Sequence, residues 1–246
     1  MLHTAPALLA VFLGAAPAPA VAAQDAKAPM IEEKESDHEY PAWVQSTLKK
    51  DASKDAKPAT LDLMGLGIRE KTIFNVNVYS YVLYVDRAFI KKDLAGYKGK
   101  KTKTVEKDEA LFDTLLTQNT TKELRMRFCR NVDAEDVVEA FEDSLKPRML
   151  KLKEKMKLPE AEKLKTLQTF RGFFSLDKLK EDMELRFTWH PDGSMSTVVN
   201  GERSPDIADP ALAKALFGVY LDDDPISSSS KKKLVRRLPG LLDAAK

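Results

Sequence analysis

The sequence predicts an α+β domain in which antiparallel strands form one curved sheet and helices cover one of its faces. Strand-like segments follow one another directly through short turns, at 61–85 and again at 184–203. The helical patterns are grouped between and after these segments instead of alternating with them one by one. The 246 residues, 43% of them hydrophobic, are enough to build a sizeable core.

The predicted strands are rich in aliphatic, β-branched and aromatic residues. Within 123–130, Leu124, Met126 and Phe128 alternate with Arg125 and Arg127, which is the period of a strand with one buried face. The other strands of the first half are predicted at 61–64, 68–73 and 76–85.

A hairpin is predicted near the end of the chain. Segment 184–189 leads through Pro191, Asp192 and Gly193 into 195–199, and this turn composition favours a reversal of the chain. Asn200 and Gly201 then offer a second tight turn into a short strand.

Helices are predicted where apolar residues recur at helical spacing. Asp133 is a candidate N-cap for a helix that Pro147 should end or kink, and 151–174 should continue as helix. Asp209 followed by Pro210 is a strong helix start, because proline is favoured at the first helical position. A last helix is predicted at 231–242, after the serine run at 227–230.

Three regions are expected along the chain. Residues 1–23 contain no Asp, Glu, Lys or Arg and end in Val-Ala-Ala, a pattern typical of a signal peptide cleaved before Gln24. A short membrane anchor or an uncleaved apolar tail is the alternative. Residues 24–60 should form a mobile leader with at most a short helix around 41–49, and residues 61–246 the folded domain. Such a protein would be periplasmic or secreted.

Composition excludes several classes of function. The 40 basic and 38 acidic residues are too evenly balanced for a nucleic-acid binder. Cys129 is the only cysteine, so no disulfide can form within the chain, and it is predicted to be a small packing residue instead of a nucleophile. The three histidines are not clustered with carboxylates at ligand spacing, so neither a metal site nor a cofactor is predicted.

Arg69 is the strongest candidate for a functional residue. It follows Gly65 and Gly67, whose missing Cβ atoms allow a sharp turn or a close approach of another chain segment. It also enters a segment with the composition of a buried strand, where a guanidinium needs an anionic partner because it cannot lose its proton. That partner is either a carboxylate of the protein, such as Glu70, or a ligand.

Several short motifs together resemble the chalcone isomerase-like superfamily. They include Gly65-x-Gly-Ile-Arg69, Val78 with Tyr79, Phe187 to Trp189 before a glycine turn, and Asp209-Pro-Ala-Leu-Ala-Lys-Ala-Leu-Phe217. The match covers residues 61–242. The resemblance implies an open-faced β-sandwich, with a large antiparallel sheet under a helical layer and a ligand cleft between them.

The resemblance implies two possible kinds of activity, because the superfamily contains isomerases and non-catalytic fatty-acid-binding members. In the isomerases the arginine works with a threonine on the next strand, a position that falls on Tyr79 here. Ala134 and Phe141 stand where the isomerase helix carries Tyr and Asn, and the last site falls near Ser204 or Pro205. An arginine beside a tyrosine is instead what the fatty-acid-binding branch presents to a carboxylate.

The predicted function is therefore binding of a small apolar carboxylate, such as a fatty acid, with Arg69, Tyr79 and Tyr81 as the ligand-binding residues. The guanidinium would hold the head group through a two-pronged contact while the acyl chain is buried. The alternatives are an isomerase or intramolecular lyase acting on a chalcone-like or other enone substrate, and a non-catalytic scaffold acting through protein partners. No nucleic-acid partner is predicted, nor a transmembrane span in the mature chain.

The stretch 146–165 alternates Lys with Glu and Leu and is predicted to be a solvated helix face. Contact of its lysines with anionic lipid headgroups is the alternative, and would be a weak membrane-surface contact.

Overall fold

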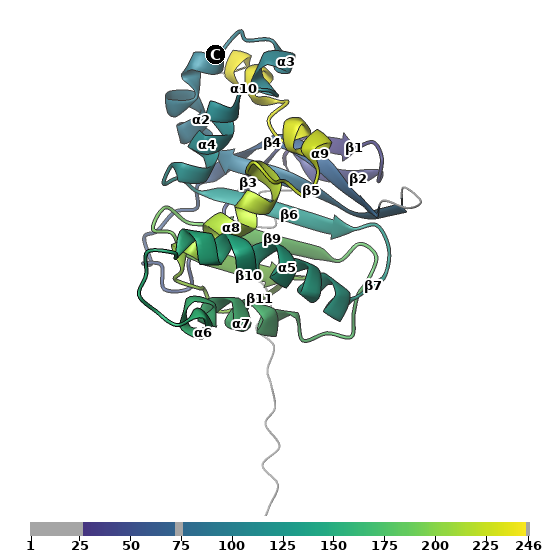
Figure 1. The fold of residues 1–246 in the computed structure, drawn as a ribbon. Helices are drawn as coiled ribbons and strands as arrows, with labels where there is room; N and C mark the ends of the chain where they lie inside the picture. The colour runs from purple at the N-terminus through teal and green to yellow at the C-terminus, as the bar shows by residue number, and fades with distance from the viewer. Residues whose placement is uncertain (1–26, 72–75, 245–246) are drawn as a thin grey trace, which may run out of the picture.

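A seven-stranded antiparallel sheet is the centre of the molecule (Figure 1). The computed structural model describes residues 27–71 and 76–244. In spatial order the strands are β11 (Glu202–Arg203), β10 (Met195–Val199), β9 (Glu184–Trp189), β6 (Lys122–Phe128), β5 (Val76–Asp86), β4 (Thr60–Lys71) and β3 (Trp43–Gln45). Strands β1 (Met30–Glu33) and β2 (His38–Pro41) form a separate hairpin, and β7 (Val132–Asp133) pairs with β8 (Lys178–Leu179).

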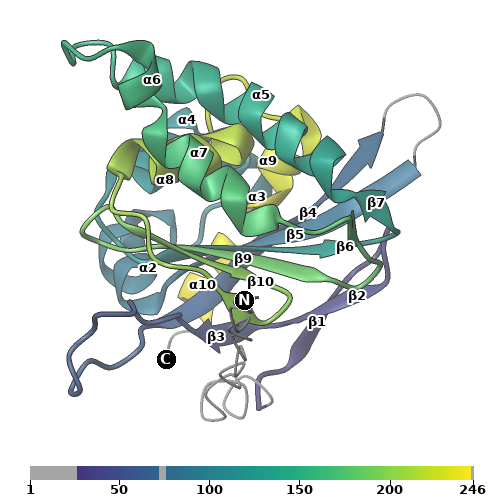
Figure 2. The same cartoon turned by 90° about the horizontal axis from the view of Figure 1, so that it is seen from below.

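Helices cover one face of the sheet, and the N-terminal hairpin lies on the other side of it (Figure 2). The longest helices are α5 (Ala134–Leu152) and α8 (Pro210–Leu221). The shorter ones are α2 (Arg87–Asp93), α3 (Thr102–Val105), α4 (Glu109–Thr117), α6 (Glu160–Lys163), α7 (Lys165–Arg171), α9 (Ser228–Lys233) and α10 (Leu238–Asp243), with 3₁₀ turns η1 (Ala95–Tyr97) and η2 (Gly172–Phe174).

The main core lies between the sheet and the helices. Alternate residues of the central strands, such as Leu83, Met126 and Phe187, pack there with Phe141 of α5 and Leu216 of α8. The alternation predicted for β6 is confirmed, since Leu124, Met126 and Phe128 belong to this core. A smaller cluster on the opposite face combines the N-terminal strands with β4 and β5, and consists of Tyr40, Val44, Leu61, Leu63, Val82 and Tyr84.

Several predicted elements appear as expected. Strands β9 and β10 form the predicted hairpin, whose Gly193 adopts φ +86°. The second turn has left-handed φ angles at Asn200 (+48°) and Gly201 (+85°). At the start of α8, the Asp209 carboxylate accepts the backbone N–H of Ala211, as the Asp-Pro pair predicted.

Other predictions about the helices are wrong. Helix α5 does not end at Pro147, which was one of the two predicted outcomes, but runs through it. Leu145 and Met149 on either side are fully buried, and the carbonyl left without a donor belongs to exposed Asp143. The helix predicted at 151–174 is interrupted before Pro159 and divides into α6 and α7. The helix predicted at 231–242 is likewise two short helices, the second carrying Pro239 in its first turn.

The N-terminal region also differs from the prediction. The expected short helix around 41–49 is wrong, because β3 occupies 43–45 and pairs with β4. β1 and β2 form where only a mobile leader was expected, and the Tyr40 side chain is buried against β5. Helices α2, α3 and α4 fill 87–117, for which the sequence made no prediction. The predicted signal peptide at 1–23 lies outside the described residues.

The strands predicted at 61–64 and 68–73 are one strand, β4, that passes through both glycines. Gly65 pairs with Leu83 and Gly67 with Tyr81, and a β-bulge lies between Leu63 and Gly65. The two glycines allow the C-terminal segment to approach β4 closely and do not form a turn. A Cβ on Gly65 would lie 2.3 Å from the carbonyl carbon of Leu234, which directly follows α9.

We expect Gly65→Ala to lower the free energy of unfolding by about 1–3 kcal/mol, because the added methyl group meets rigid backbone. Gly96→Ala is the matched control, since no atom lies within 4 Å of its Cβ position. That control should be neutral or slightly stabilising. Urea unfolding of both variants measures the difference, and equal stabilities would contradict close packing of α9 on β4.

Lys122 is a buried cation on the core side of β6. Its Nζ donates to the Gln118 carbonyl at 2.8 Å and lies 4.2 Å from the centre of the Trp189 ring. No carboxylate of the described residues forms an ion pair with it. Burial lowers the pKa of Lys122 to about 7. Between pH 7 and the ordinary lysine pKa, the unfolded chain therefore holds a proton that the folded chain has lost, and the free energy of unfolding rises with pH.

Lys122→Met should consequently be more stable than the native chain at pH 7, because methionine has no charge to desolvate. This gain should shrink as the pH is raised from 7 toward 10.5, the ordinary pKa of a lysine side chain. Denaturant titrations of both proteins across this range give the difference. If Lys122→Met were instead less stable by the same amount at every pH, the contact between the Lys122 ammonium and the Trp189 ring would outweigh the cost of burying the charge.

Candidate functional site

Arg69 and Tyr79 are neighbours across the β4–β5 pair, and Tyr81 lies one step along the same face of β5, opposite Gly67. All three face the helical layer. The Nη1 atom of Arg69 lies 3.4 Å from the carbonyl oxygen of Ile226, in the segment between α8 and α9. The structure thus brings the three residues predicted from sequence together at one place on the sheet.

The C-terminal segment with α9 can pack next to Arg69 because β4 has no side chain at Gly65 and Gly67. At Gly67 a Cβ atom would lie 2.9 Å from the Tyr81 ring and 3.1 Å from the Cβ of Ser230. Ser230 is buried and donates its hydroxyl to the Ile68 carbonyl at 3.1 Å. The glycines therefore allow α9 to lie directly on the strand that carries Arg69.

Arg69 opens into a pocket of about 220 Å³ between the end of β4 and the start of α9. The lining is polar, apart from Ile68 and Ile226, and its other members are Glu35, Arg69, Glu70, Ser227, Ser229, Ser230 and Lys233. Lys233 is already paired with Glu35, at 2.6 Å.

Arg69 itself is half-buried, and within residues 27–71 and 76–244 no carboxylate lies within ion-pair distance of it. The ion pair with Glu70 that the sequence left open is absent from this part of the chain. The pocket therefore presents a guanidinium with free donors, because its long contact with the Ile226 carbonyl uses only one of them.

A layer of tyrosine rings lies behind Arg69, between β5 and α8. The Tyr79 and Tyr220 hydroxyl oxygens are 3.2 Å apart, and the Tyr81 and Tyr220 ring centres are 4.7 Å apart. The Tyr81 hydroxyl is buried beside Ser230, without a hydrogen bond of good geometry to any described residue. These rings fill the space where the sequence predicted a cleft.

The phenols remain protonated at neutral pH. Burial raises the pKa of Tyr79, Tyr81 and Tyr220, and the positive charge of Arg69 offsets this only in part for each of them. A protonated phenol can donate a hydrogen bond to an anion. The arrangement is thus suited to holding an anion between Arg69 and a neutral donor, and less suited to supplying a phenolate base.

Tyr220 and Ser230 were not predicted as members of the site. The sequence placed Tyr220 among aliphatic residues on a helix face and Ser230 in a linker-like serine run. The one available signal was the phenol itself, because a tyrosine on an otherwise apolar buried face needs a polar partner.

The positions that the isomerase resemblance singled out do not converge on Arg69. Ala134 and Phe141 are buried in α5, where Phe141 packs on Phe170, Phe174 and Phe187. Ser204 follows β11 at the far end of the sheet from β4, and its backbone N–H bonds to Thr197. None of these residues lines the Arg69 pocket.

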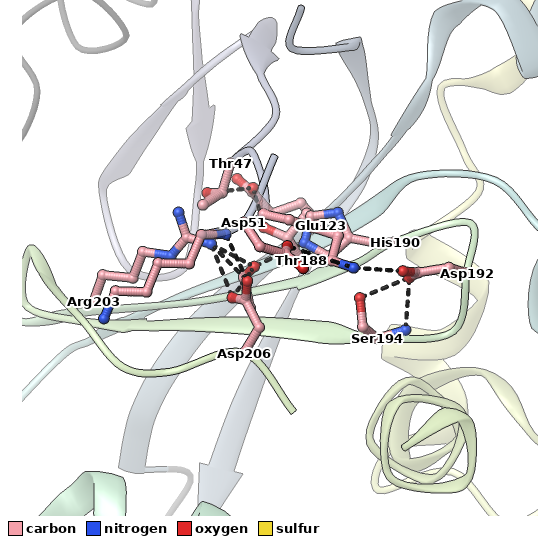
Figure 3. Close-up of polar contacts among 12 residues, drawn as sticks. Thr47, Asp51, Glu123, Thr188, His190, Asp192, Ser194, Arg203 and Asp206 are labelled. Atoms are coloured by element: carbon pink, nitrogen blue, oxygen red, sulfur yellow. Dashed lines mark hydrogen bonds and ion pairs between the residues drawn. The ribbon is translucent and has the colours of Figure 1, made fainter. Parts of the chain in front are cut away.

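A second group of polar residues lies on the opposite face, at the end of β9 and β10 (Figure 3). The Ser196 hydroxyl donates to Asp206 at 2.6 Å and accepts from His190 Nε2 at 2.7 Å. Arg203 also bonds Asp206, as does the backbone N–H of Lys50. Burial lowers the pKa of His190, and Ser196 is only 1% exposed, so this serine is a structural link and not an accessible nucleophile.

The same group fastens the segment before β4 to the sheet. Lys49 bonds Asp192 at 2.7 Å, and Thr47 bonds buried Glu123, which also accepts from Thr188 at 2.7 Å (Figure 3). His190 lies in the turn before β10, as the sequence predicted, since its backbone pairs with Ser194 and Gly193. These contacts are structural.

Ser80, His38 and Asp182 form a further serine–histidine–aspartate row, with Ser80 Oγ 2.6 Å from His38 Nδ1 and His38 Nε2 3.5 Å from Asp182. Ser80 is fully buried under Tyr40, which also bonds its hydroxyl, so no substrate reaches it. Burial raises the pKa of Cys129 to about 11, which makes a thiolate nucleophile unfavourable there. Among the described residues, no cluster of three or more His, Cys, Asp or Glu side chains could hold a metal ion.

Two Arabidopsis thaliana proteins are similar to this chain, one in sequence and one in structure. A relative described as fatty-acid-binding protein 2 of Arabidopsis thaliana is 24% identical over 201 residues, which cover 79% of this chain and 48% of that protein. The chain thus spans about half the length of this curated relative. A crystal structure of an Arabidopsis thaliana fatty-acid binding protein matches with a TM-score of 0.66 at 18% identity, covering 87% of this chain and 100% of that one.

The structural match confirms the predicted fold, an antiparallel sheet under a helical layer. The family model described as chalcone isomerase like matches residues 59–235, most of the chain. The protein therefore belongs to the chalcone isomerase-like family.

Proposed function

We propose that this protein binds a fatty acid or a similar small apolar carboxylate, with its head group at Arg69. The observation that carries the proposal is a half-buried guanidinium, without a carboxylate partner in the described residues, facing a pocket lined with serine hydroxyls. The names of the two Arabidopsis relatives give independent support, because both are described as fatty-acid-binding proteins.

The head group would be held by several donors at once. A carboxylate accepts two parallel N–H bonds from a guanidinium, and the Tyr79 phenol beside it supplies a further donor. Tyr81 lies one layer deeper, and its hydroxyl lacks a well-formed bond in the described residues, so a deeper-seated oxygen would also find a partner there.

The acyl chain would enter between β5 and α8 by displacing the tyrosine rings. The pocket of about 220 Å³ is smaller than the roughly 300–1,000 Å³ of typical ligand sites, so it accommodates a head group and not a long chain. Each buried methylene contributes about 0.8 kcal/mol, so burial of a longer acyl chain sets a larger gain against the cost of separating the rings. Ligand length should therefore matter strongly.

Arg69→Ala should weaken binding of a medium-chain fatty acid by about 2–5 kcal/mol, because it removes the charged partner of a desolvated carboxylate. Tyr79→Phe should cost about 0.5–1.5 kcal/mol, as expected for one hydrogen bond. Arg69→Lys should restore binding only in part, since an ammonium lacks the planar fork. Isothermal titration of the three variants measures these losses, and thermal unfolding without ligand should change little.

Arg87→Ala is the matched control. Arg87 forms a two-pronged ion pair with buried Asp62, at 2.6 Å and 2.9 Å, and lies outside the Arg69 pocket. Its removal should lower the melting temperature and leave the affinity of the folded fraction unchanged. If Arg69→Ala instead lowered the melting temperature and left the affinity unchanged, Arg69 would be structural. The alternative of a non-catalytic scaffold that acts through protein partners would then replace the binding proposal.

An assay with a hydroxylated chalcone separates binding from catalysis. We expect cyclisation no faster than in buffer, because the positions of the isomerase helix, Ala134 and Phe141, carry no polar group. Saturable turnover that disappears in Arg69→Ala would establish an isomerase and overturn the binding-only proposal.

We further propose that the protein is exported, as a periplasmic or secreted protein. The support is the uncharged stretch 1–23 ending in Val-Ala-Ala. In the described part of the chain, no helix has both the length and the apolar character that a membrane span requires.

Mass spectrometry of the intact protein from its own host should show a chain that begins at or near Gln24. Signal-peptide cleavage there would remove the whole apolar stretch. Recovery of a chain that retains Met1 from the cytosolic fraction would refute the export proposal.

A further inference from the structure

The last two residues of α5 and the segment that joins it to α6, together residues 151–159, expose three large apolar side chains. Leu152 is 42% exposed, and Met156 and Leu158 are each 50% exposed. We name residues 151–159 the α5–α6 tip. It projects beyond the helical layer (Figure 2). Scattered exposed apolar residues need no explanation, but three within seven residues at a projecting loop do.

Exposed lysines surround these side chains. Lys151, Lys155 and Lys157 are exposed, and within the described residues none of them forms an ion pair. Glu154 is the single acidic residue of the tip. Lys153 is buried in an ion pair with Asp209. The exposed charge of the tip is therefore that of three lysines and one glutamate, or +2.

The base of the tip is tightly held. Lys153 is buried, and its Nζ lies 2.5 Å from the Asp209 carboxylate and 2.8 Å from the Lys163 carbonyl. Asp209 also caps α8. The ion pair joins the end of α5 to the start of α8, and the hydrogen bond to Lys163 joins it to the end of α6. The apolar side chains therefore project from a segment that is anchored at its base.

We propose that the α5–α6 tip docks on the surface of an anionic lipid bilayer. Unpaired lysines complement the negative surface of such a membrane, while Leu152, Met156 and Leu158 enter the boundary between headgroups and acyl chains. A protein partner fits less well, because the tip is convex and contains none of the Trp, Tyr or Arg residues that dominate protein–protein contacts. The proposal does not depend on what Arg69 binds.

The test is flotation of the full chain with vesicles of phosphatidylcholine, with or without phosphatidylglycerol. Binding should require phosphatidylglycerol. The triple variant Lys151→Gln, Lys155→Gln, Lys157→Gln should reduce the bound fraction roughly tenfold or more, since each lysine near an anionic surface contributes appreciably. The double variant Met156→Gln, Leu158→Gln keeps the charge and should also reduce binding markedly.

A matched control replaces Lys98, Lys103 and Lys107 with Gln. These lysines are exposed, and no large apolar side chain of segment 98–107 is exposed. The control should bind like the native chain, and circular dichroism verifies that every variant is folded.

Three results would overturn the proposal. One is binding that does not depend on phosphatidylglycerol: binding to neither kind of vesicle would favour a protein partner for the tip, and equal binding to both would show that its lysines do not recognise anionic lipid. Another is a loss of binding in the control as large as in the tip variants, which would indicate non-specific charge attraction. The third is dependence on Arg69 instead of the tip, seen as loss of flotation in Arg69→Ala, which would show that the Arg69 pocket holds the lipid.

Discussion

The close approach of the C-terminal segment to β4 is the constraint on which the site depends. Only a strand without side chains at two alternate positions allows α9 and the turn after it to lie against its backbone, and Gly65 and Gly67 provide this. The contact is then fixed by polar bonds to the strand itself, from Ser230 to Ile68 and from the Arg237 backbone N–H to Met64. Arg69, two residues beyond Gly67, consequently faces the backbone at Ile226 instead of open solvent.

Buried polar groups differ in how well they are satisfied, and on each face some are left without a hydrogen bond among the described residues, such as Arg127 Nε on one face and the Tyr81 hydroxyl on the other. On the face away from the main helices, Glu123 is fully buried but bonds Arg125 at 2.6 Å and Thr188 at 2.7 Å. On the helical face, the described residues leave the Arg69 guanidinium without an ion pair and the Tyr81 hydroxyl without a well-formed bond. Since buried polar groups of folded proteins normally find partners, the second arrangement favours a ligand and the first a structural role.

The sequence was informative where the signal is local. The period of β6, the turn at Gly193 and the Asp209 cap are each determined by a few adjacent residues, and each was predicted correctly. A helix end at Pro147, one of the two predicted outcomes, is wrong because the burial of Leu145 and Met149 outweighs the loss of one hydrogen bond, and that burial depends on the whole fold. The pairing of Arg69 with Tyr79 was predicted from a family resemblance. The contact of Tyr220 with Tyr79 and Tyr81 was not predicted, because no short-range pattern in the sequence indicates where α8 packs.

Strand β3 has a consequence for the integrity of the sheet. The region that matches the family begins at residue 59, after β3, yet β3 pairs with Thr60, Leu61 and Asp62 at the outer edge of β4. A chain that began at residue 59 would leave those N–H and C=O groups open on a long strand at the margin of the sheet. Such margins pair readily with other chains and aggregate. The short segment upstream covers these groups at the start of β4, and this covering is independent of any ligand.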